Sequence, residues 1–189
     1  PRDVVSGDFY WFMKATGKTV IACVDCTGHG VPGAFMSMIG NTLLNEIVVE
    51  KKITQPDQIL NLLHERVRQS LKQDMENTET RDGMDIAICV IDEAKELLQY
   101  AGANRSLIII RDKSLIELKA DKQPIGGDQM EQDRIFKNNE FKIHKGDTIY
   151  MTTDGFADQF GGEKGKKFMV KRLHQLLIDL NDEKIIIFR

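Results

Sequence analysis

The spacing of the hydrophobic residues changes twice along this chain, and this change restricts the fold more than any other feature. Residues 7–15 and 19–24 are apolar runs on either side of a Thr-Gly-Lys turn, which predicts a β-hairpin. Over residues 32–49 and 56–71 the apolar residues recur every three or four positions, which predicts two amphipathic helices. Short strand-like runs then return, so the chain combines sheets with helices.

The second half of the chain predicts further strands separated by turns rich in Asp, Asn, Gly and Lys, a pattern typical of an antiparallel meander. The predicted elements are strands at 86–91, 97–101, 107–111, 115–118, 141–143 and 148–153, a helix at 168–180 and a closing strand at 184–188. This order predicts an α+β fold, an αββα sandwich of two mostly antiparallel sheets flanked by helices. We expect residues 1–189 to form a single domain.

Composition excludes several classes of protein. The net charge is -3 with acidic and basic residues interspersed, which argues against a nucleic-acid partner. No apolar run approaches the roughly 20 residues that cross a bilayer, so we expect no membrane insertion. Three cysteines in apolar surroundings favour reduced thiols and the cytoplasm. The first residues resemble neither a start methionine nor a signal peptide, so we expect the C-terminal part of a longer signalling protein, such as the cytoplasmic part of a larger sensor.

Four aspartates lie where an apolar run meets a turn of glycine or other small residues: Asp8, Asp25, Asp85 and Asp154. The predicted hairpin would bring Asp8 and Asp25 to the same end. Converging carboxylates repel one another unless a cation lies between them. Oxygen donors without suitably spaced histidine or cysteine favour magnesium or manganese. The alternative interpretation is that each aspartate is an ordinary turn residue.

Two neighbouring residues have alternative interpretations. His29, between two glycines, could be a base or a ligand, but a role in orienting the loop by hydrogen bonding is favoured. Cys26 could be a nucleophile. No arginine follows it at the spacing of the cysteine-dependent phosphatases, and this disfavours that interpretation.

Five motifs occur in order along nearly the whole chain. They are Ser6-Gly7-Asp8-Phe9-Tyr10-Trp11, the run from Val24-Asp25-Cys26 to Ala34-Phe35-Met36, Asp82-Gly83-Met84-Asp85-Ile86-Ala87, Ala101-Gly102-Ala103-Asn104 and Thr153-Asp154-Gly155. This set resembles the stage II sporulation protein E (SpoIIE) type of bacterial serine/threonine phosphatase, a branch of the metal-dependent type 2C phosphatases. The resemblance implies a type 2C phosphatase-like double β-sandwich.

The resemblance also implies two manganese or magnesium ions at one rim of the sandwich. Asp25 would bridge both ions, Asp8 and the backbone carbonyl of Cys26 would complete one site, and Asp154 would hold the other ion. The ions would activate a water molecule for in-line attack on phosphorus. Asp182 is the candidate for the terminal aspartate of the family, and Asp82 and Asp85 could hold a third ion or position the substrate.

The substrates implied by the resemblance are phosphoserine or phosphothreonine residues of a regulatory protein, such as an anti-sigma-factor antagonist. Regions upstream of the domain would carry the sensor and a possible homodimer contact. Two alternatives remain open at this stage. The chain could be an inactive or switched-off phosphatase-like binding module, or a metal-dependent nuclease, although the nuclease interpretation lacks a basic groove.

Overall fold

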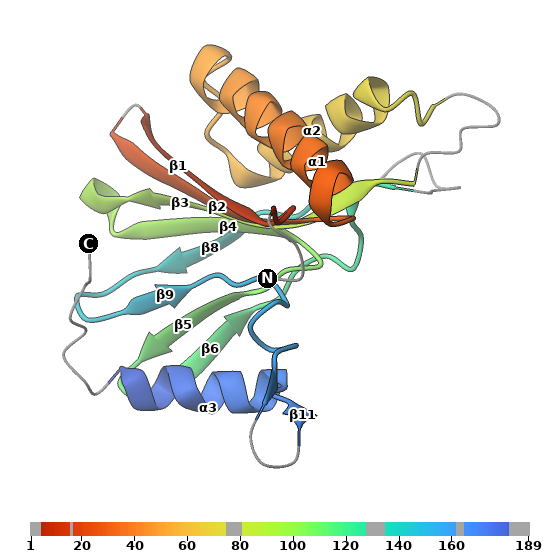
Figure 1. The fold of residues 1–189 in the computed structure, drawn as a ribbon. Helices are drawn as coiled ribbons and strands as arrows, with labels where there is room; N and C mark the ends of the chain where they lie inside the picture. Colours follow the sequence, from red (N-terminus) through yellow and green to blue (C-terminus); the bar gives the residue numbers. More distant parts are fainter. Residues whose placement is uncertain (1–4, 16, 75–80, 128–134, 162–164, 182–189) are drawn as a thin grey trace.

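The N-terminal hairpin forms one edge of the larger of two stacked sheets (Figure 1). The computed structural model describes residues 5–15, 17–74, 81–127, 135–161 and 165–181. The larger sheet has the order β1-β2-β3-β4-β8, and β7 pairs with β3. Its antiparallel strands are β1 (Phe9–Ala15), β2 (Lys18–Cys26), β3 (Gly83–Asp92), β4 (Leu97–Ala103), β7 (Ile125–Gly126) and β8 (Asn139–Lys142).

The smaller sheet has the order β6-β5-β9 and contains β5 (Leu107–Arg111), β6 (Ser114–Leu118) and β9 (Thr148–Tyr150). The predicted antiparallel meander is wrong at one point: β3 pairs with β4 and β5 with β6 as expected, but β4 and β5 belong to different sheets. Asn104, in the left-handed region at φ +57, turns the chain out of the first sheet directly after β4. The strand predicted at 148–153 also ends earlier than expected, at Tyr150.

Helices cover the outer faces of both sheets (Figure 1). The helical elements are α1 (Gly30–Leu44), the π-helical turn η1 (Asn45–Glu50) that continues it, α2 (Pro56–Ser70), the 3₁₀ turn η2 (Glu93–Lys95) and α3 (Val170–Leu180). Between β9 and α3, β10 (Phe160–Gly161) and β11 (Lys166–Lys167) form a small hairpin. The expected αββα sandwich is confirmed, whereas the predicted strand at 184–188 lies outside the described residues.

Side chains of β2 alternate between two cores. Val20, Ala22 and Val24 are completely buried against the helices α1 and α2, whereas Ile21 points toward the core between the sheets. This alternation follows from the period of two in a strand. Full burial of such a side chain contributes about 1.5 to 3 kcal/mol. A third cluster lies between the smaller sheet and α3.

None of the helices that the structure describes combines the length and the hydropathy needed to cross a membrane.

Candidate active site

Strand register brings three of the singled-out aspartates together at one end of the larger sheet. Phe9 pairs with Val24, so Asp8 precedes β1 beside Asp25 near the end of β2. Asp25 pairs with Asp85 of β3. Because Asp25 has the same parity as Ile21, its side chain points toward the smaller sheet. Two carboxylates thus face each other across neighbouring strands.

The loop between β2 and α1 is held close to the start of the chain by glycines. A Cβ atom on Gly33 would lie 2.9 Å from the carbonyl oxygen of Gly28 and 3.2 Å from the Cα of Gly7. A Cβ on Gly7 would in turn lie 3.3 Å from the carbonyl oxygen of Cys26. Only residues without a side chain permit this approach. The packing fixes the backbone next to Asp25.

Thr27 ties the same loop to the start of β3. Its backbone N–H donates to the carbonyl of Gly83 at 2.9 Å, and the N–H of Gly83 donates to the Thr27 hydroxyl oxygen at 3.0 Å. The Thr27 hydroxyl donates to Asp82 at 3.0 Å. In this structure Asp82 therefore supports the loop, and a role for it in binding an ion stays a prediction.

Asp154 reaches the same place from the second sheet. It follows β9 in a turn in which the N–H of Asp158 donates to the Asp154 carbonyl at 2.9 Å. A Cβ on Gly155 would lie 3.8 Å from Oδ2 of Asp8, so this turn adjoins the carboxylate of Asp8. The side chain of Asp154 is 59% exposed, which leaves it accessible from solvent.

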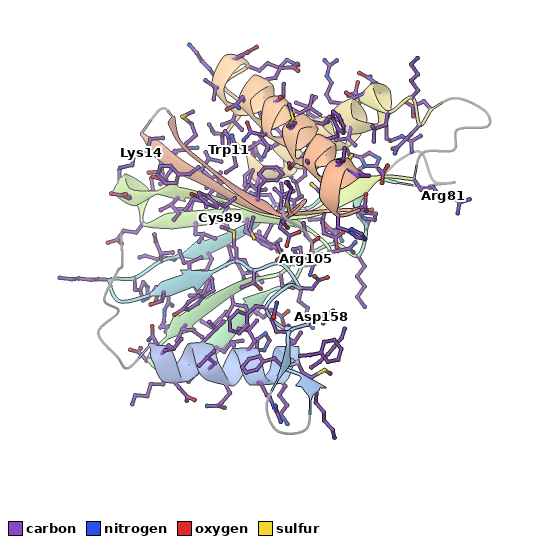
Figure 2. The ribbon with its side chains drawn as sticks, in the orientation of Figure 1. Trp11, Lys14, Arg81, Cys89, Arg105 and Asp158 are labelled. Atoms are coloured by element: carbon purple, nitrogen blue, oxygen red, sulfur yellow. The ribbon has the colours of Figure 1, made fainter. Side chains whose placement is uncertain are left out.

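Arg105, which no sequence pattern predicted as a site residue, lies at the centre of this cluster. It belongs to the loop between β4 and β5, at the end of the sandwich between the two sheets (Figure 2). Its Nη2 donates to Oδ2 of Asp25 and, at 2.9 Å, to Oδ2 of Asp154. The same nitrogen lies 3.4 Å from Oδ2 of Asp85. One guanidinium group therefore contacts carboxylates from both sheets.

The end of β4 positions Arg105. The Tyr100 hydroxyl donates to the carbonyl oxygen of Arg105 at 2.6 Å, and it passes over Gly102, where a Cβ would lie only 2.0 Å from the hydroxyl oxygen. The next residue on this face, Asn104, donates through Nδ2 to Oδ1 of Asp85 at 2.9 Å. The Ala-Gly-Ala-Asn motif in the sequence marked this turn. Its glycine was the one signal that could have pointed to Arg105.

The pKa of Asp25 is raised from 3.8 to about 7. Burial is the largest cause, and the negative charges of Asp8 and Asp154 raise it further, whereas Arg105 lowers it. Burial, followed by the charges of Asp25 and Asp8, also raises the pKa of the Cys26 thiol to about 12. A thiol that stays protonated is a poor nucleophile, which agrees with rejecting Cys26 in that role.

The carboxylate cluster has the chemistry of a site for a hard cation, but the guanidinium of Arg105 contacts its carboxylates in this structure. The oxygen donors of Asp8, Asp25 and Asp154 suit magnesium or manganese, and their mutual repulsion calls for a positive charge. In the described part of the chain, no group of three or more His, Cys, Asp or Glu residues is arranged so that it could hold a metal ion as it stands. The positive charge in this cluster comes from the chain itself, because the guanidinium of Arg105 contacts two of the three candidate ligands, Asp25 and Asp154. The donor set therefore suits a divalent cation by its chemistry, and in this structure the guanidinium of Arg105 supplies the positive charge.

Two further predicted residues are less informative. His29 precedes α1 as an exposed residue whose side chain does not cap the helix, and its role stays a prediction. Asp182, the candidate terminal ligand, lies outside the described residues.

The sequence matches the family model of stage II sporulation protein E over residues 15–185. The chain belongs to the SpoIIE family. The resemblance read from the five motifs is thereby confirmed, together with membership of the type 2C phosphatase class.

Known proteins similar to this SpoIIE-family chain agree with the assignment. It is 30% identical over 162 residues to the phosphoserine phosphatase RsbU of Bacillus subtilis, a match that covers 84% of this chain and 44% of RsbU. This chain thus spans less than half the length of that curated relative.

Solved structures add the fold. The SiaA-PP2C domain of Pseudomonas aeruginosa superposes with a TM-score of 0.82 at 34% identity, over 95% of this chain and 68% of that domain's chain. The PP2C phosphatase domain of SpoIIE from Bacillus subtilis, solved with a fragment of its regulatory domain, gives a TM-score of 0.68 at 19% identity. That match covers 97% of this chain and 48% of the SpoIIE chain, and it concerns the fold alone.

Proposed function

We propose that this SpoIIE-family chain is a metal-dependent phosphoprotein phosphatase that hydrolyses phosphoserine or phosphothreonine on a regulatory protein. The observation that carries the proposal is the convergence of Asp8, Asp25 and Asp154 at one end of the sandwich, in a chain whose family is that of phosphatases. The pKa of Asp25 is raised to about 7, chiefly by burial and then by the negative charges of Asp8 and Asp154, which is the electrostatic consequence of gathering these carboxylates.

The chain's own residues would hold two manganese or magnesium ions. Asp25 would contribute to both, Asp8 and the carbonyl oxygen of Cys26 to one, and Asp154 to the other. Bound ions of this type supply an activated water and neutralise charge on the phosphoryl group. The glycine contacts around Gly7 and Gly33 support these roles because they fix the backbone that carries Asp25 and Cys26.

Asp85 has a different proposed role from the other aspartates. It pairs with Asp25, and its Oδ1 accepts a hydrogen bond from Asn104. A carboxylate oriented in this way would hold a third, looser ion or position the substrate beside Asp25.

The biological setting is also proposed. The curated relative is named a phosphoserine phosphatase, which supports a phosphorylated regulatory protein as the substrate, and an anti-sigma-factor antagonist is the candidate class. This chain matches less than half of that relative, which supports a single phosphatase domain within a longer signalling protein and leaves room for a dimer contact upstream. The free thiols of Cys23, Cys26 and Cys89 support a reducing, cytoplasmic location.

The test measures hydrolysis of p-nitrophenyl phosphate and of a phosphoserine peptide with manganese, with magnesium and with EDTA. We expect turnover that requires the metal, and we expect Asp25→Asn to lower kcat by at least about 100-fold because it removes the shared ligand. Asp112→Asn is the matched control, since it removes an exposed carboxylate from a left-handed turn position that asparagine tolerates. Turnover that survives EDTA or Asp25→Asn contradicts the mechanism, whereas peptide binding without turnover favours a binding module.

A further inference from the structure

Arg105 uses the same carboxylate oxygens that a metal ion would need. Its Nη2 donates to Oδ2 of Asp25 and Oδ2 of Asp154, which come from different sheets. The exposed fractions of the Arg105 and Asp25 side chains are only 18% and 16%, so water screens their contact weakly. The guanidinium therefore acts as the positive charge of this cluster.

A divalent cation and this guanidinium would compete for the same two carboxylate oxygens, Oδ2 of Asp25 and Oδ2 of Asp154. A metal ligand donates an oxygen lone pair to the ion, and the Oδ2 atoms of Asp25 and Asp154 already accept N–H groups. A positive charge a few ångströms from an incoming cation also repels it, and the repulsion is large at partly buried sites. Metal binding at these oxygens would therefore compete with the contacts of Arg105.

The surroundings of Arg105 hold its backbone more firmly than its head group. The backbone carbonyl is fixed by the Tyr100 hydroxyl at 2.6 Å, whereas the guanidinium is bonded through Nη2 to carboxylates. Its Nε is buried without a hydrogen-bond partner among the residues that the structure describes. An unpaired buried donor is costly, so once a metal occupies the carboxylates little favours the present side-chain position.

We propose that Arg105 is the internal counter-cation of this cluster, and that a divalent cation binds by displacing its guanidinium from Asp25 and Asp154. The inference rests on the proposed function, because it assumes that these aspartates hold a metal. Arg105 thereby sets the metal concentration at which the phosphatase becomes active. The chain carries its own competitor for the metal.

The decisive experiment is titration of the metal-free protein with Mn²⁺ in a calorimeter, with wild type compared with Arg105→Gln. We expect Arg105→Gln to bind Mn²⁺ at least about tenfold more tightly, because a competing positive charge is removed. Arg172→Gln is the control for net charge, since Arg172 is exposed on α3. The Mn²⁺ affinity of this variant should stay within about twofold of wild type. Equal or weaker binding by Arg105→Gln overturns the inference.

Thermal melting gives a second readout that does not depend on turnover. In EDTA, Arg105→Gln leaves the carboxylates without their counter-cation, so its melting temperature should fall below that of wild type. In saturating Mn²⁺ the difference should shrink, because the metal supplies the charge. An equal decrease in both conditions would mean that Arg105 has only a structural role and would overturn the inference.

Arg105→Lys tests whether charge is the cause. Lysine keeps the positive charge, so its Mn²⁺ affinity should stay closer to that of wild type than the affinity of Arg105→Gln does. Equal tightening in both variants contradicts competition by charge. If wild type binds no Mn²⁺, the proposed function fails together with this inference. If wild type binds Mn²⁺ and hydrolyses the peptide but Arg105→Gln gains no affinity, this inference alone fails.

Discussion

One buried hydroxyl group connects the core between the sheets to the candidate active site. Tyr100 is completely buried, and its hydroxyl donates to the carbonyl oxygen of Arg105. Tyr100→Phe should lower the free energy of unfolding by about 1 to 2 kcal/mol, because it leaves that carbonyl without this donor. Urea unfolding measures the change. Tyr10→Phe is the control, since Tyr10 is 83% exposed, and a similar loss in both variants would contradict the argument.

A single methyl group at Gly33 should disturb the loop beside the carboxylate cluster. Gly33→Ala would bring a methyl group within 2.9 Å of the backbone carbonyl of Gly28, so the loop next to Asp25 must move. We expect a loss of about 1 to 3 kcal/mol in unfolding free energy, together with weaker Mn²⁺ binding. Calorimetry and urea unfolding measure the two effects.

Gly161→Ala provides the matched control for that substitution. A Cβ on Gly161 would meet nothing within 4 Å, so stability should change by less than about 0.5 kcal/mol. Wild-type metal affinity in Gly33→Ala would show that the loop adapts without moving Asp25, and the positioning argument would then be wrong.

The sequence singled out the aspartates that converge in the structure but not their cationic partner. Asp8, Asp25 and Asp154 could be found because each lies where an apolar run meets a turn. Arg105 follows a turn asparagine, and no periodic pattern connects it to carboxylates that lie up to 80 residues away in sequence. Contacts of that kind depend on how two sheets stack, which periodicity within one strand does not encode.

At the scale of elements, segments long enough to show a period were predicted well, including the five-residue strands β5 and β6, and the two-residue strands were not. The helix predicted at 56–71 is α2, and the hairpin agrees with β1 and β2. The two-residue strands β7, β10 and β11 escaped prediction because two residues contain no period. The sequence did not predict that β4 and β5 belong to different sheets. Two apolar strands joined by a turn have the same sequence pattern whether they pair in one sheet or lie in two.

Helix α2 should stabilise the fold through one face. Leu63 is completely buried against the larger sheet, whereas Glu65 is exposed. Leu63→Ala should cost about 2 to 5 kcal/mol of unfolding free energy, since it removes apolar contacts and leaves a cavity. Glu65→Ala should change it by less than about 0.5 kcal/mol. Urea unfolding compares the two variants, and equal losses would contradict the packing of this face.

At the scale of the whole molecule, two arginines join the sheets at opposite ends of β5. Arg105 precedes the strand and contacts aspartates of both sheets. Arg111 ends the strand. Its Nη2 donates to the carbonyl of Lys142 in β8 at 2.8 Å, and its guanidinium lies 4.8 Å from the centre of the Phe141 ring. Under the inference above, a metal would reorganise the end at Arg105, whereas Arg111 joins β5 to β8 through the contacts just given.

The ion pair of Arg111 with Asp147 predicts how acid should destabilise this end of the sandwich. Arg111 donates to both carboxylate oxygens of Asp147 at 2.8 and 2.7 Å, and the backbone N–H of His144 donates to one of them. The hydrogen bond from Arg111 is the main reason why the pKa of Asp147 lies below 3.8, its ordinary value. A carboxyl group with a lowered pKa stabilises the fold above its unfolded pKa, and this contribution disappears as the pH falls through the folded pKa.

Wild type should therefore lose stability progressively below about pH 4, and Asp147→Asn should lose less over the same range because its side chain does not titrate. At pH 7 the variant should be the less stable of the two, since the ion pair with Arg111 is absent. Urea unfolding in EDTA at a series of pH values measures both effects without a contribution from metal binding. Glu50→Gln, which removes an exposed carboxylate, is the control for net charge. If Asp147→Asn and wild type lose stability in parallel below pH 4, the Arg111 contact does not stabilise this end of the sandwich.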